Sequence, residues 1–292
     1  MSAAALALVL ASAVLHAGWN ALVAGAQDTH ATAAVAMLTG VVVFAIPAAL
    51  TWRVEAQAWP FIAASAALEL AYFALLAATY SRADYSFAYP VARGSAPILV
   101  LLISTIALGA DISPLAIVGI LAVTGGVLLV RGVGTDAVDK TSLLFALGVL
   151  AITGGVLVVR GVGTDAVDAT SLVLALGVGA CIAGYTLVDD RGVEYSAPIP
   201  YFEIVLLLSA IPYALVVGHE RLRKAVDRRS VPAGVGMAAA YILVLAALER
   251  APAAPVAALR ETSILLAGVG GGRRRLAGSA LVVAGIAAVV FG

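Results

Sequence analysis

Residues 121–149 read LAVTGGVLLVRGVGTDAVDKTSLLFALGV, and residues 150–178 repeat them with only five positions changed. Each copy holds about one apolar helix of membrane length followed by a short polar loop. One added crossing moves every later loop to the other face of a membrane. This stretch therefore decides the topology of the fold that the rest of the chain builds.

The composition around the duplication is that of a membrane protein. Of the 292 residues, 63% are hydrophobic and 12% are charged, and the mean hydropathy is +1.08. A soluble domain carries about 25% charged residues, so lipid is the solvent that fits. The net charge of zero gives no electrostatic case for nucleic acid. The single cysteine, Cys181, excludes an intramolecular disulfide.

Eleven apolar segments approach the length of about 20 residues that a bilayer crossing needs. They cover residues 2–24, 31–52, 59–80, 85–108, 113–131, 142–160, 171–189, 199–218, 231–248, 252–271 and 276–292. Helices satisfy their own backbone hydrogen bonds in lipid, and the many Gly and Ala residues let helices approach closely. The sequence therefore predicts an all-α polytopic bundle of ten or eleven transmembrane helices.

A weaker repeat relates the two ends of the chain. Residues 75–95 read LLAATYSRADYSFAYPVARGS, and residues 243–263 read LVLAALERAPAAPVAALRETS. Two halves with an odd number of crossings insert with opposite orientation, which is a recurring plan of secondary transporters. We expect a five-helix half over 1–141, the duplicated helix and loop over 142–170, and a second five-helix half over 171–292.

Three short motifs carry a resemblance to a known family. They are HAGWNA at 16–21, YPVARG at 89–94 and LRETS at 259–263. In this order and spacing the chain resembles the EamA-type permeases of the drug/metabolite transporter superfamily. The resemblance implies ten helices in two inverted halves that move small organic solutes, such as amino acids or their derivatives, with no cofactor.

The chain also departs from the pattern of that family. Arg93 and Gly119 are 26 residues apart, whereas Arg260 and the matching Gly278 are only 18 apart. The ninth helix of the family is therefore shortened here. This leaves a second interpretation open, in which the chain is a non-transporting degenerate paralogue or a membrane scaffold of the same fold.

Glu69 is the clearest candidate for a functional residue. It lies midway along the segment 59–80, with Tyr72 one turn later. A charged side chain at a helix centre costs roughly 2.5–3.5 kcal/mol in insertion experiments, so its presence needs a reason. We interpret Glu69 as a carboxylate that binds a proton or a substrate amine and faces a cavity. The alternative is a structural carboxyl group bonded across helices.

The first helix supplies a second group of candidates. His16 and Asn20 are four residues apart and share one helical face, with Trp19 beside them. They form either one wall of a substrate cavity or an interhelical hydrogen-bonding pair. No metal site is expected, because His16, His30 and His219 are far apart in the sequence.

The remaining candidates are arginines with their neighbours. Arg93, one turn after Tyr89, either meets an anionic group on the substrate or extends to the interface. Arg260 and Glu261 are adjacent, so we expect them to point to different faces and to neutralise charges on other helices. Three further carboxylates lie close to helix ends and are expected at the interface, namely Asp189, Asp190 and Glu203.

The topology follows from the basic loops. The loop at 219–230 carries five Lys or Arg residues, and the loop at 273–275 carries three. The positive-inside rule places this face in the cytoplasm. If all eleven segments cross, which the equal hydrophobicity of the two copies favours, the N-terminus is cytoplasmic. If one copy does not cross, both termini lie outside.

Together these patterns predict a secondary transporter of a small metabolite in the cytoplasmic (inner) membrane, with protons as one candidate for a coupling ion. No catalytic dyad, phosphate loop or metal cluster is visible, so an enzyme is not expected. The residues do not determine the substrate, the direction of transport, the coupling ion or the oligomeric state.

Overall fold

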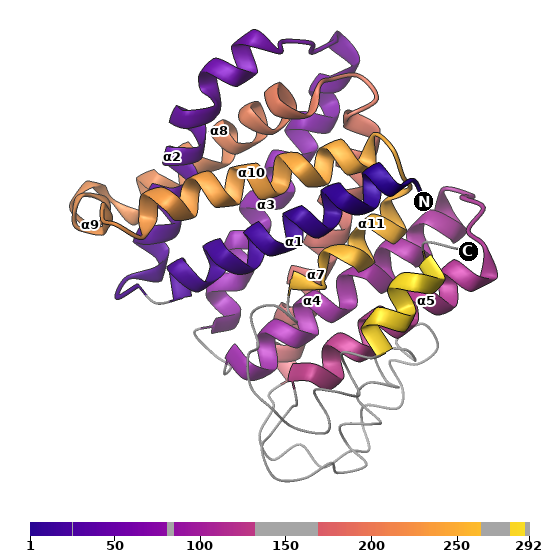
Figure 1. Cartoon of the computed structure of the whole chain (residues 1–292). Coiled ribbons are helices and arrows are strands. Elements are labelled where there is room, and N and C mark those ends of the chain that lie inside the picture. Colours follow the sequence, from indigo (N-terminus) through magenta and orange to yellow (C-terminus); the bar gives the residue numbers. More distant parts are fainter. Residues whose placement is uncertain (25, 81–84, 132–168, 264–280, 290–292) are drawn as a thin grey trace. The chain divides into compact units, whose positions relative to one another are not determined.

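The computed structural model describes residues 1–24, 26–80, 85–131, 169–263 and 281–289. This part of the chain is almost entirely helical, and its only β pairing is an isolated bridge between Val54 and Ser196. The helices, drawn in Figure 1, are α1 (Ala3–Ala24), α2 (Thr29–Leu50), α3 (Trp59–Tyr80), α4 (Tyr85–Leu102), α5 (Pro114–Arg131), α7 (Ala169–Gly192), α8 (Pro198–Val217), α9 (His219–Ala225), α10 (Ser230–Leu248) and α11 (Ala253–Arg260). A further helix covers residues 281–289.

Six of the described helices are long and apolar enough to cross a membrane. The expectation of an all-α chain with several membrane-length helices is therefore confirmed. The segment 142–160 lies outside the described residues. The segment predicted over 252–271 is helical as α11 only to Arg260, and residues 264–271 lie outside the description. The loop predicted at 219–230 contains the short helix α9.

The chain forms two compact units. Unit 1 comprises Met1–Leu70 and Gly184–Val256, and unit 2 comprises Ala71–Ala183 and Ala257–Gly292. Each unit draws on both the N-terminal and the C-terminal part of the chain. The inverted repeat expected from the sequence remains a prediction.

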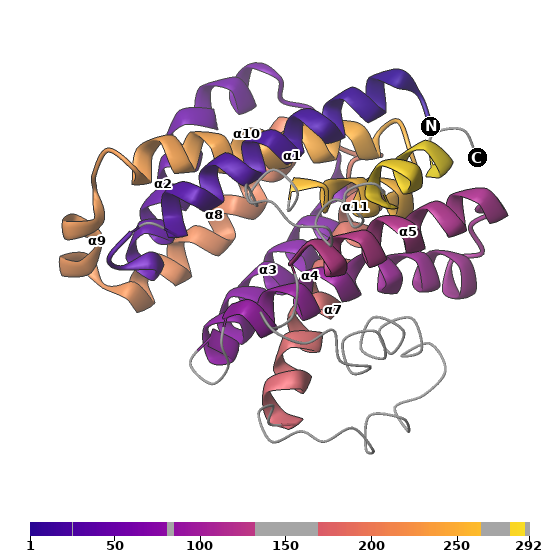
Figure 2. The same ribbon diagram turned by 60° about the horizontal axis from the view of Figure 1, so that its bottom comes forward.

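Unit 1 is built around α10, against which both α1 and α2 pack. Helices α1 and α10 run side by side in Figures 1 and 2, and Ser12 Oγ donates to the carbonyl of Ala240 at 2.7 Å. Where α2 meets α10, a Cβ on Gly234 would lie 2.3 Å from the carbonyl oxygen of Ala36. Only glycine permits this backbone contact, as in other membrane bundles whose helices approach through small residues.

Unit 1 has two ends, which we name by what lies there. At the basic end, Asp28 before α2 binds Arg221 of α9, with N–O distances of 2.8 and 3.0 Å. At the pocket end, Arg53 after α2 donates to the carbonyl of Ser196 at 3.3 Å and lies 3.5 Å from Glu249. Helix α2 is thus tied to its neighbours beyond both of its ends.

Two further helices have one end each at the pocket end. Helix α3 begins and α7 ends at the pocket end, because the residues flanking them pair there: Ala197 N–H donates to Arg53 at 2.8 Å and Glu55 N–H to Tyr195 at 2.9 Å. The segment 142–160 lies outside the described residues, so the choice between ten and eleven crossings remains a prediction.

Unit 2 has equally close helix contacts. A Cβ on Gly119 of α5 would lie 2.7 Å from the carbonyl oxygen of Gly285 in the helix 281–289. A Cβ on Gly179 of α7 would lie 2.0 Å from Ser95 Oγ on α4. Small residues therefore set the helix packing in this unit as well.

Candidate functional site

A cluster of carboxyl and hydroxyl groups lies inside unit 1, and each of four helices contributes to it. We call it the carboxylate–tyrosine cluster, and its members are Glu69 of α3, Asp189 of α7, Tyr201 and Ser209 of α8, and Tyr241 of α10. Asp189 is fully buried. It accepts hydrogen bonds from the Tyr201 hydroxyl at 2.9 Å and from the Tyr241 hydroxyl.

Glu69 lies beside Asp189 in the same cluster. It is partly buried, it is hydrogen-bonded to the side chain of Ser209, and it interacts electrostatically with Asp189. Two neighbouring carboxyl groups repel each other strongly when they are withdrawn from water. A proton bound to either carboxyl group relieves this repulsion, so the pair can hold a proton.

The local sequence explains how Tyr201 reaches Asp189. A Cβ on Gly192, at the end of α7, would lie 2.3 Å from the Tyr201 ring. Glycine therefore leaves the space in which the ring lies against α7 with its hydroxyl on Asp189. On the other side of the carboxylate, the rings of Tyr185 and Phe202 pack on Tyr241 with centroid distances of 6.0 and 4.9 Å.

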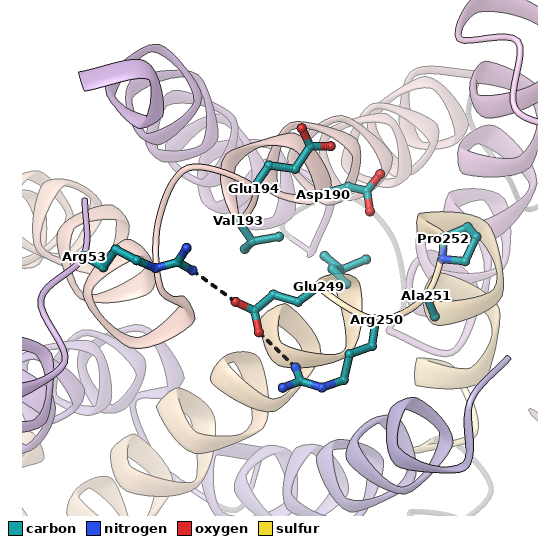
Figure 3. A pocket seen from close by; sticks show the side chains of 9 residues that line it. Arg53, Asp190, Val193, Glu194, Glu249, Arg250, Ala251 and Pro252 are labelled. Carbon is teal, nitrogen blue, oxygen red and sulfur yellow. Dashed lines mark hydrogen bonds and ion pairs between the residues drawn. The ribbon is translucent and has the colours of Figure 1, made fainter. Parts of the chain in front are cut away.

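A pocket of about 520 Å³ opens at the pocket end of unit 1 (Figure 3). Its lining residues come from the ends of α7 and α10 and from the segments that follow α2, α7 and α10: Arg53, Asp190, Val193, Glu194, Leu248, Glu249, Arg250, Ala251 and Pro252. The pocket is one helical turn from the cluster, because the Val193 N–H donates to the backbone carbonyl of Asp189 at 3.0 Å. The pocket and the cluster are therefore close neighbours along α7.

The pocket carries charges of both signs. Glu249 lies between two guanidinium groups, at 3.5 Å from Arg53 and 2.9 Å from Arg250 (Figure 3). Asp190, on the opposite wall, has no hydrogen bond or ion pair to any described residue. The walls therefore differ in character, since one presents two arginines around a glutamate and the other an unpaired carboxylate.

The burial of Asp189 corrects the expectation that it lies at the interface. Helix α7 continues to Gly192, so Asp189 lies nearly one turn inside the helix end, where two tyrosine hydroxyls replace water. Asp190 lines the pocket at the pocket end, and its place at the interface remains a prediction. The sequence did hold a signal for the burial of Asp189. Tyr201 and Tyr241 lie within apolar segments, and a buried phenol hydroxyl needs a hydrogen-bond acceptor.

The candidates on α1 are bonded to one another. Trp19 Nε1 donates to His16 Nδ1 at 3.3 Å, and the Asn20 amide donates to the His16 carbonyl at 2.8 Å. The three side chains are partly buried and share one face, as their spacing predicts. Their role in a substrate cavity remains a prediction.

The other predicted residues belong to unit 2 and are described apart from the cluster. The rings of Tyr72 and Phe73 meet edge to face, with centroids 5.0 Å apart. Tyr89 and Arg93 lie on α4, but their side chains are outside the described parts. Their roles therefore remain predictions.

Arg260 and Glu261 require a correction. They were expected to point to different faces, yet both are buried and Arg260 Nε lies 3.7 Å from Glu261 Oε1. The reason is that α11 ends at Arg260 and Glu261 begins a turn, so the helical spacing does not separate them.

The described residues contain no group of three or more His, Cys, Asp or Glu side chains placed to hold a metal ion.

Glu203 of α8 also departs from the interfacial expectation in part, since one of its carboxylate oxygens is buried without a hydrogen-bond partner.

Comparison with known proteins identifies the fold but no family. No family model matches the chain, and no curated protein matches it. Twelve chains of solved structures are similar to it. For one crystal structure the TM-score is 0.68 at 15% sequence identity, over 98% of this chain and 96% of the other. The chain therefore shares the fold of a known protein over nearly its whole length.

Proposed function

We propose that this protein is a secondary transporter that moves a small organic metabolite across the cytoplasmic membrane. The observation that carries the proposal is the buried carboxylate–tyrosine cluster one helical turn from an open pocket, inside a bundle of membrane-length helices. Ionisable groups at such depth mark ion and substrate pathways by default. The resemblance of three motifs to EamA-type permeases supports the same function.

The residues divide the work as follows. Glu69 and Asp189 bind the coupling proton, and the hydroxyls of Tyr201 and Tyr241 hold Asp189 in place. Substrate enters through the pocket beside Asp190. His16, Trp19 and Asn20 of α1 line the route. Tyr72, Tyr89 and Arg93 keep the roles in substrate binding that the sequence predicts.

Flux into proteoliposomes tests the proposal. The purified protein is reconstituted, and uptake of a panel of isotope-labelled amino acids and other small metabolites is measured with and without an imposed pH gradient. We expect at least one solute to enter faster than into protein-free liposomes, with stimulation by the gradient. We expect Asp189→Asn to reduce this flux by on the order of tenfold or more, since the site would lose its titratable carboxyl group. The control variant Arg191→Gln removes an exposed ion pair and keeps the flux.

Absence of flux from the whole panel would favour the second interpretation, a non-transporting membrane protein of the same fold. A further variant then locates the cause. If flux appears after deletion of residues 150–178, the duplicated stretch is what blocks transport.

A further inference from the structure

The basic end of unit 1 carries a surface that the proposed transport does not use. It consists of α9 and the turn that follows it, where five cationic residues fall within nine positions: Arg221, Arg223, Lys224, Arg228 and Arg229. All five are exposed. Five positive charges so close together, directly after a helix of membrane length, attract anions from the surrounding solvent or membrane.

Only part of this charge is compensated within the protein. Arg221 is bound in bidentate fashion by Asp28. The carboxylate of Asp227 accepts the backbone N–H groups of Arg229 and Ser230, and so serves the start of α10. Among the described residues, no carboxylate lies within ion-pair distance of Arg223, Lys224 or Arg228.

The helix that presents these cations is held in place. Leu222 and Ala225 pack on an apolar cluster that includes Ala31 and Val35 of α2, and the Asp28–Arg221 pair lies beside it. Figure 1 shows α9 as a short helix where α8 and α10 meet. The positive groups are therefore fixed before any ligand arrives, which lowers the entropy cost of binding.

Two exposed apolar side chains lie next to these cations in the sequence. Val226 is 61% exposed and Val231 is 43% exposed, on either side of the Arg228–Arg229 pair. Val226 directly follows α9, and Val231 is the second residue of α10, where the apolar part of that helix starts. Exposed valine next to exposed arginine suits the boundary between lipid headgroups and acyl chains better than it suits water.

We propose that α9 and the following turn bind the headgroups of anionic phospholipids in the leaflet that meets the basic end. The cations of Arg223, Lys224 and Arg228 contact the lipid phosphates, and Val226 and Val231 contact the upper acyl chains. Juxtamembrane Lys and Arg residues typically gain about 1 kcal/mol each from an anionic surface. This lipid stabilises unit 1 by joining the end of α8 to the start of α10.

Thermal unfolding in a neutral detergent tests this inference independently of transport. Phosphatidylglycerol or phosphatidylcholine is titrated into the full-length protein, and Tm is followed. We expect phosphatidylglycerol to raise Tm by about 3 °C or more and phosphatidylcholine to have little effect. Salt at about 0.5 M should remove most of the increase, because it screens exposed charges.

Two matched variants sharpen the test. Arg223→Gln/Lys224→Gln should lose most of the phosphatidylglycerol effect. Arg191→Gln/Arg250→Gln removes the same charge at the pocket end and should keep it. If the first variant does not fold, the salt dependence of the parent still decides. Equal stabilisation by both lipids, an unchanged response of the first variant, or the same increase with inorganic phosphate alone would overturn the proposal.

Discussion

Two aspartates of unit 1 make similar numbers of hydrogen bonds in opposite surroundings. Asp189 is fully buried and accepts from Tyr201 and Tyr241. Asp28 is 38% exposed at the basic end and binds the guanidinium of Arg221. An exposed pair is screened by water and contributes little to stability. A carboxylate inside a membrane bundle is costly and persists when it is bonded and has a function. Burial, more than the number of bonds, distinguishes the candidate site from a surface contact.

The largest effect is expected where Asp189 is truncated. Asp189→Ala leaves two tyrosine hydroxyls in the bundle without their acceptor, and we expect the free energy of unfolding to fall by about 2–4 kcal/mol. The equivalent change at the surface, Asp28→Ala, should cost about 1 kcal/mol or less. Unfolding of both variants in mixed micelles measures the difference. Equal losses would show that burial does not separate the two sites.

The next effect concerns the glycine that makes room for Tyr201. Gly192→Ala places a Cβ against the Tyr201 ring, and we expect a loss of about 1–3 kcal/mol together with a weakened bond to Asp189. Gly18→Ala is the matched control, because a Cβ there has no atom within 4 Å and alanine favours a helix. The comparison of the two Tm values checks the prediction. If Gly192→Ala were as stable as Gly18→Ala, the packing of Tyr201 on α7 would have to be different.

A smaller effect is expected from single hydroxyl groups. Tyr241→Phe removes one donor to the buried Asp189 and should cost about 1–2 kcal/mol. Tyr213→Phe removes the exposed hydrogen bond to His30 Nδ1, 2.9 Å long, and should cost less than about 0.5 kcal/mol. Chemical unfolding of the two variants ranks them, and the reverse order would contradict the comparison.

The smallest effect is the pH dependence at the basic end. The hydrogen bonds from Arg221 and from the Ala31 backbone N–H lower the pKa of Asp28 from 3.8 to about 2. Because folding lowers the pKa of the Asp28 carboxyl group, the ionised group stabilises the folded state at pH values above its ordinary pKa. This contribution to stability is lost as the pH falls from about 4 toward 2. The Tm of the parent should therefore exceed that of Asp28→Asn at pH 7, and the gap should close near pH 2. A gap that stays constant over this range would exclude the ion pair as its cause.

Hydropathy predicted most of the helices because lipid demands long apolar runs, and α1, α3 and α8 begin within a residue of the expected positions. It missed α9, whose seven residues are mostly polar and are held by tertiary contacts of Leu222 and Ala225. Such a short helix has no period that a sequence pattern could reveal.

The candidate site was predicted in part. Glu69 stood out as a charge within an apolar run, whereas Asp189 was hidden by its position near a helix end. Its burial depends on Tyr201 and Tyr241 from two other helices, and the local sequence does not predict which side chains of different helices will meet. The same holds for Arg260 and Glu261, which meet only because α11 ends between them.

The proposed binding of a coupling proton by Glu69 and Asp189 can be tested without knowledge of the substrate. Proteoliposomes on a solid-supported membrane are exposed to a pH jump, and the transient current is recorded. The parent protein should give a proton-binding current that Glu69→Gln/Asp189→Asn abolishes and Arg191→Gln retains. A current of equal size in the double carboxylate variant would contradict the claim.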